Sequence, residues 1–67
     1  MKNKITELRK RMGLSQQELA LRCEVTRQTI NAIENDKYDP TLALAFKLSR
    51  TLGVTVDMLF TYEEELK

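Results

Sequence analysis

Three polar side chains with hydrogen-bonding tips, Arg27, Gln28 and Asn31, lie close together in one short segment. Arginine can donate two hydrogen bonds to O6 and N7 of guanine, and glutamine can pair with N6 and N7 of adenine. Ile30 and Ile33 lie on one face of a helix over the same segment, which leaves the polar residues on its solvent side. The pattern predicts a helix that reads base edges of duplex DNA. The alternative is the solvated face of an ordinary amphipathic helix.

A second short helix precedes this one. Ser15 is a favoured N-cap residue, and Glu18 follows three positions later, which is the pattern of a capping box. Thr26 offers a second N-cap hydroxyl. We therefore predict helices over about Gln16–Cys23 and Arg27–Asn35, joined by a tight turn. This is a helix-turn-helix whose second member is the recognition helix.

Three further helices are predicted around this pair. The first covers about Asn3–Met12, with Asn3 as its cap, an apolar stripe that includes Met12, and Gly13 as its stop. The fourth covers Leu42–Leu52 after a cap at Thr41. A short fifth helix is capped by Thr55. The expected fold class is therefore all-α.

The composition limits the possible classes of protein. Sixty-seven residues allow one domain, with a core over about 3–60 and a tail over 61–67, and 42% hydrophobic with 31% charged residues indicates a globular chain. There is no histidine, and the single cysteine, Cys23, falls on an apolar helix face. We expect Cys23 to be a core residue, and we expect no metal, cofactor, small-molecule ligand or enzymatic activity. No apolar run is long enough for a signal peptide or a membrane span, so we expect a cytoplasmic protein.

The charge is unevenly distributed although the net charge is only +1. Residues 1–37 carry eight bases and five acids, and residues 38–67 carry three bases and five acids. The half that holds the predicted motif is therefore the positive one, which suits a face turned toward phosphates. Alone, this excess is common on ordinary protein surfaces.

The segment from about Ile5 to Phe60 resembles the phage Cro and repressor type of helix-turn-helix domain, the XRE-like family. The resemblance is carried by LSQQELA, VTRQTINAIE and the later LGVTVDMLF. It implies a compact bundle of five helices whose third helix enters the major groove. It also implies a transcriptional regulator, most often a repressor, that binds palindromic double-stranded DNA as a homodimer.

The resemblance also implies roles for individual residues. Gln16 matches a glutamine that clamps a phosphate, and Arg9 and Glu34 match a pair that bridges the first and third helices; the alternative for that pair is two solvated charges. For Tyr38 the alternative is a ring packed over its loop, and for Gln17 it is simple exposure. The complete set of candidate DNA-binding residues is Gln16, Gln17, Thr26, Arg27, Gln28, Thr29, Asn31, Lys37 and Tyr38.

Two positions depart from the family pattern, and one surface is left open. Glu24 and Asp36 stand where many members have glycine, and Glu24 places an anion near the DNA face.

The fourth helix has more apolar residues than one stripe needs. The candidate dimer surface is therefore Leu44, Phe46, Tyr62 and Leu66, with the alternative that these residues serve the core of one subunit.

A competing hypothesis is a protein-interaction module on the same fold that does not read DNA. The presence of polar residues at Gln16, Arg27 and Gln28 argues against it. A narrower role, as an antitoxin or a restriction-modification controller, cannot be separated from a general repressor by sequence.

Overall fold

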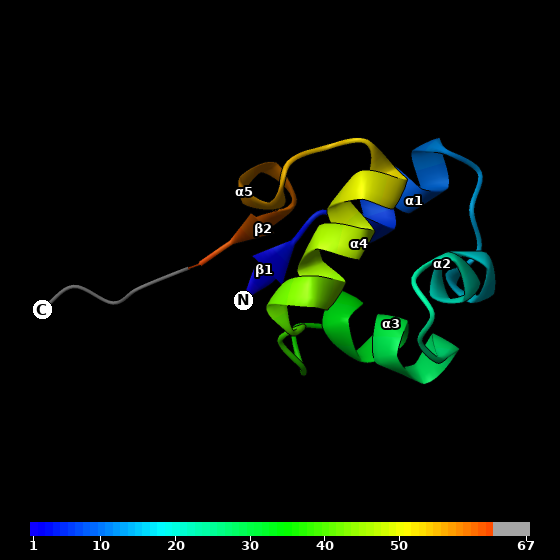
Figure 1. The fold of residues 1–67 in the computed structure, drawn as a ribbon, viewed down its shortest axis with the longest axis horizontal. Helices are drawn as coiled ribbons and strands as arrows, with labels where there is room; N and C mark the ends of the chain where they lie inside the picture. The colour runs from blue at the N-terminus through cyan, green and yellow to red at the C-terminus, as the bar shows by residue number, and fades with distance from the viewer. Residues whose placement is uncertain (63–67) are drawn as a thin grey trace, which may run out of the picture.

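The computed structural model describes residues 1–62 as five helices and a two-stranded ribbon. Figure 1 shows α4 in the middle of the molecule, with α2 and α3 on one side and the ribbon on another. The chain therefore folds as the all-α class predicted, with one small addition of strand. The elements in order are β1 (Lys2–Asn3), α1 (Ile5–Arg11), α2 (Gln16–Arg22), α3 (Arg27–Glu34), α4 (Leu42–Leu52), α5 (Val56–Leu59) and β2 (Phe60–Thr61).

Side-chain caps set the start of three helices. Ser15 accepts a hydrogen bond from the backbone N–H of Glu18, and the Glu18 carboxylate accepts one in return, so the predicted capping box is present. The hydroxyls of Thr26 and Thr41 cap α3 and α4 by accepting hydrogen bonds from the backbone N–H groups of Thr29 and Leu44. Each cap satisfies a backbone donor that has no partner within the helix. These helices therefore begin where the sequence predicted.

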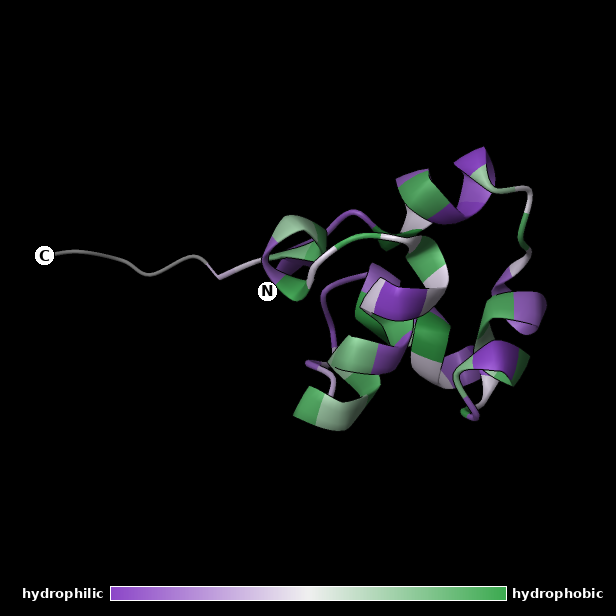
Figure 2. Cartoon of the chain, turned by 45° about the horizontal axis from the view of Figure 1, so that its top comes forward, coloured by the Kyte–Doolittle hydropathy of each residue, from purple (hydrophilic) through white to green (hydrophobic). Residues whose placement is uncertain are grey.

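The core lies where the helices meet. Leu19, Ile30 and Leu48, from α2, α3 and α4, are completely buried together with Cys23. Figure 2 shows polar and apolar residues alternating along the helices, as expected when each helix turns one face inward. Cys23 is thus a core residue, as predicted.

The ribbon is a feature that the sequence did not reveal. β1 and β2 pair antiparallel, with Lys2 opposite Thr61 and Asn3 opposite Phe60. The backbone N–H of Lys4 extends the connection by donating to the carbonyl of Leu59 at 2.9 Å. Two-residue strands have no usable period, so alternation could not predict them. The ribbon joins the beginning of the described chain to its end.

Four local predictions were wrong. Asn3 is not the cap of α1: Lys4 occupies that position, and Asn3 instead accepts a hydrogen bond from the N–H of Ile5 and donates one to the carbonyl of Ile33. Met12 lies beyond the end of α1 and is 48% exposed. Thr55 precedes α5 but makes no side-chain cap.

The fourth error concerns the proposed dimer surface. Leu44 is only 7% exposed and belongs to the core, because its side of α4 faces the other helices. Phe46 and Tyr62 are exposed, at 50% and 76%. Leu66 lies outside the described residues.

Candidate nucleic-acid interface

The turn between α2 and α3 depends on one residue with a left-handed backbone. Glu24 has φ 61°, a conformation that lets the chain leave α2 sharply. Its carboxylate forms an exposed ion pair with Nζ of Lys47 at 3.1 Å. Val25 follows, is partly buried, and packs against the core between the two helices. The two helices are therefore held in a fixed relation.

Four of the predicted DNA-binding residues lie together at this junction. Gln16, at the start of α2, and Arg27, Gln28 and Asn31, from α3, line a shallow open hollow of about 270 Å³. The three residues of α3 are exposed, and Gln16 is partly buried. Polar side chains on an exposed recognition helix, next to the start of another helix, can contact base edges and a phosphate at the same time.

A buried ion pair lies beneath this hollow. Nε of Arg9 is 2.8 Å from a carboxylate oxygen of Glu34, and the two side chains are only 11% and 5% exposed. Nη1 of Arg9 also donates to the carbonyl of Leu14 at 2.9 Å. The pair therefore joins α1 to the last turn of α3, as the family resemblance implied, and it is not a pair of solvated charges.

Glu34 also contacts Gln16, one of the residues that line the hollow. Nε2 of Gln16 donates to Oε1 of Glu34 at 2.8 Å. Burial acts to raise the pKa of Glu34, but hydrogen bonds from Arg9, Gln16 and Thr6 outweigh that effect, so its pKa lies below the ordinary value of 4.5. Glu34 is thus a carboxylate at neutral pH, and it can only accept hydrogen bonds.

Hydrogen bonds also restrict the other polar residues of α3. Nδ2 of Asn35 donates to the backbone carbonyl of Asn31 at 2.9 Å and lies 3.2 Å from Oδ1 of the same residue. The oxygen of Asn31 is therefore partly occupied, and its amide N–H groups are the ones it can offer outward. The hydroxyls of Thr26 and Thr29 are 3.0 Å apart. Thr26 serves chiefly as a cap, and Thr29 is partly buried.

The remaining candidates are exposed near the two helices. Gln17 follows Gln16 on α2, and Lys37 and Tyr38 follow the end of α3. Asp36 has φ 60°, which directs the chain out of α3. Tyr38 is 48% exposed. All three side chains are accessible to a nucleic-acid backbone.

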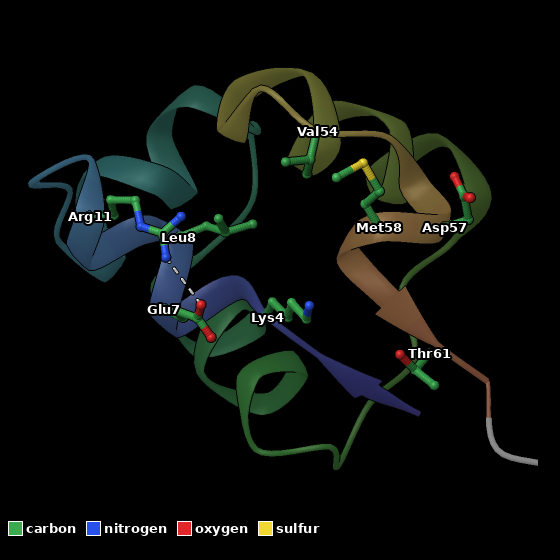
Figure 3. Close-up of a pocket in the computed structure, with 8 residues that line it drawn as sticks. All are labelled: Lys4, Glu7, Leu8, Arg11, Val54, Asp57, Met58 and Thr61. Carbon is green, nitrogen blue, oxygen red and sulfur yellow. Dashed lines mark hydrogen bonds and ion pairs between the residues drawn. The ribbon is translucent and has the colours of Figure 1, made fainter.

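A second hollow, of about 340 Å³, lies between α1 and α5 and differs in chemistry (Figure 3). The apolar residues Leu8, Val54 and Met58 line it, and its charges are mixed. Glu7 pairs with Arg11 at 3.3 Å, and Asp57 adds an anion on the other side. Its two acids balance its two bases, Lys4 and Arg11, so this hollow has no excess positive charge to attract a phosphate backbone. The α2–α3 surface is therefore the candidate site.

Sequence reasoning missed several contacts that support the site. The carbonyl of Leu14 and the side chains of Thr6, Asn35 and Lys47 all bind candidate site residues or their neighbours. Each contact joins residues that sequence spacing does not place together, except Asn35, which lies one helical turn after Asn31. That i, i+4 relation was visible in the sequence.

Comparison with known proteins agrees with this geometry. The helix-turn-helix family model matches residues 5–59. The transcriptional regulator MJ0272 of Methanocaldococcus jannaschii is 48% identical over 65 residues, which cover 97% of this chain and 98% of that protein. YgzD of Bacillus subtilis, described likewise as an HTH-type transcriptional regulator, is 46% identical with the same coverage.

Solved structures give the same result. The restriction-modification controller protein C.AhdI from Aeromonas hydrophila is 30% identical, has a TM-score of 0.78, and is similar over 85% of this chain and 86% of its own. The SinR protein, solved in complex with SinI, is 31% identical with a TM-score of 0.75, over 81% of this chain and 53% of its own.

The fold and the arrangement of α2 and α3 define a helix-turn-helix protein. The chain belongs to the XRE-type helix-turn-helix family of transcriptional regulators. That family is a class of regulators and not of enzymes. Within residues 1–62, no helix is long and apolar enough to cross a membrane, and no group of three acidic, cysteine or histidine side chains could hold a metal ion.

Proposed function

We propose that this regulator binds a specific duplex sequence through α3 in the major groove, as a homodimer on a near-palindromic operator, and represses transcription there. One observation carries the proposal: Arg27, Gln28 and Asn31 project from one short helix beside Gln16 at the start of another. Arg27 is assigned to a guanine and Gln28 to an adenine. Gln16 and Lys37 are assigned to phosphates.

The homodimer follows from the size of the reading element. An α-helix of eight residues is about 12 Å long and reaches only a few base pairs. A two-fold dimer presents two such helices about 34–36 Å apart, one turn of the duplex. Leu42 and Phe46 on α4, together with Tyr62, are among the exposed large apolar residues, and they are assigned to the contact between subunits. Occupancy of a site that overlaps a promoter is sufficient for repression, and the protein would act in the cytoplasm, where the operator is.

The test is a selection of bound duplexes from a random pool at about physiological salt, with wild type and Arg27→Ala in parallel. We expect an enriched inverted repeat. The mutant should lose preference at one base pair in each half-site, by about 1–3 kcal/mol. Half-sites one helical turn apart would support the dimer.

The alternative is an interaction module that binds another protein through the same fold. SinR, a relative in structure, was solved with a protein partner, which keeps this alternative open. Weak, salt-sensitive binding of all duplexes by both proteins, without enrichment, would favour it.

A further inference from the structure

We propose that Glu34 is a positioning residue for DNA binding, because it orients the Gln16 side-chain amide so that one N–H is directed at Glu34 and the other is available to a phosphate oxygen. The inference rests on the proposed function, and it assigns a role in binding to a carboxylate that lies below the DNA-facing surface.

The orientation of the Gln16 amide follows from the chemistry of its partner. A glutamine amide has an oxygen end that only accepts hydrogen bonds and a nitrogen end that donates two. The Glu34 carboxylate can only accept, and it lies 2.8 Å from Nε2 of Gln16. The nitrogen end of Gln16 must therefore lie at Glu34. If the amide turned over, two oxygens would face each other.

This orientation decides what Gln16 presents to DNA. A phosphate oxygen needs a donor, and the oxygen end of an amide would repel it. Gln16 is partly buried and borders the open hollow of α2 and α3, so its second N–H can reach outside.

Arg9 makes an anion tolerable so close to a phosphate. Nε of Arg9 is 2.8 Å, and Nη2 is 3.4 Å, from the two carboxylate oxygens of Glu34. The pair is neutral as a whole, and both side chains are nearly excluded from solvent. Glu34 is thus fixed by α1 on one side while it fixes Gln16 on the other.

The experiment replaces the ion pair without changing the net charge. In the double variant Arg9→Met/Glu34→Met both partners become apolar residues of similar length, a replacement that buried ion pairs often tolerate. Long-range attraction to DNA is unchanged, whereas Gln16 loses its acceptor. Thermal unfolding followed by circular dichroism verifies that the variant is folded at the temperature of the binding assay.

Binding is then measured by fluorescence anisotropy on the duplex that the wild type selects. We expect Arg9→Met/Glu34→Met and Gln16→Ala each to weaken binding at least about tenfold, which is the loss expected for a hydrogen bond to a charged acceptor. The triple variant with Gln16→Ala should bind no more weakly than the double. As a control, Arg27→Ala in the same background should multiply the loss, because its base contact is independent of Glu34.

Wild-type affinity in the double variant, or a multiplied loss in the triple, would overturn the proposal. If the double variant does not fold, NMR of the wild-type protein tests the same point. The two side-chain amide protons of Gln16 should have distinct shifts, and only one should move strongly on titration with the duplex. Equal movement of both would count against the orientation. A wild type that selects no duplex refutes the proposed function itself, which is a different result.

Discussion

We expect Glu24→Gly to stabilise the protein by about 0.5–1 kcal/mol. Glu24 has φ 61°, where an L-residue is strained by roughly 1–2 kcal/mol because Cβ approaches the following carbonyl oxygen. Glycine has no Cβ and so removes this strain. It also raises the conformational entropy of the unfolded chain, which offsets part of the gain in stability. The Lys47 ion pair that would be lost is exposed on both sides and contributes little.

Thermal and urea unfolding provide the measurement. A gain of this size corresponds to a rise in Tm of about 2–8 °C for a domain of this length. The matched control is Glu24→Ala, which also removes the ion pair but keeps Cβ and the strain. We expect the alanine variant to be slightly less stable than wild type. If glycine and alanine prove equally stable, backbone strain at this turn is not the cause and the reasoning fails.

Two other outcomes follow from the core and the buried pair. Leu48→Ala should lower the free energy of unfolding by about 2–5 kcal/mol, because Leu48 is completely buried. Leu21→Ala, on an exposed face, should change it by no more than about 0.5 kcal/mol. Similar urea midpoints for the two variants would contradict this expectation. The pKa of Glu34 is lowered in the folded state, so Glu34 stabilises the protein at a pH above its ordinary pKa of 4.5. This stabilisation is lost as the pH falls below that value. Urea unfolding at several pH values should show this fall in the free energy of unfolding, and the fall should be smaller in Arg9→Met/Glu34→Met. If the double variant loses as much stability in acid as the wild type, other carboxylates cause the loss.

The helices could be predicted because residues close to their ends in the sequence determine where they begin and stop. The capping box at Ser15 and the hydroxyls of Thr26 and Thr41 fix where α2, α3 and α4 begin, and each interacts with residues only three positions away. Gly53 ends α4 in the left-handed conformation that glycine favours. Such signals need no knowledge of tertiary structure.

Contacts distant in sequence were harder to predict. Nothing local indicates that Asn3 binds the carbonyl of Ile33, or that Leu44 faces inward while Phe46 does not, because α4 is apolar around much of its circumference. The Arg9–Glu34 pair was predicted only through resemblance to a family, and its link to Gln16 was not predicted at all. The candidate base-reading residues were found because α3 has a clear periodicity, and their assignment to bases awaits the selection experiment.

The ribbon between β1 and β2 has a consequence for how the chain folds during synthesis. Lys2 and Asn3 pair with Thr61 and Phe60, so the hydrogen bonds of β1 cannot form until the much later residues of β2 have been synthesised. Helices α2 and α3 depend on local contacts and can form earlier. The helix-turn-helix pair can therefore take shape before β2 is synthesised, and the backbone N–H of Lys4, just before α1, has no carbonyl of Leu59 to bind until then.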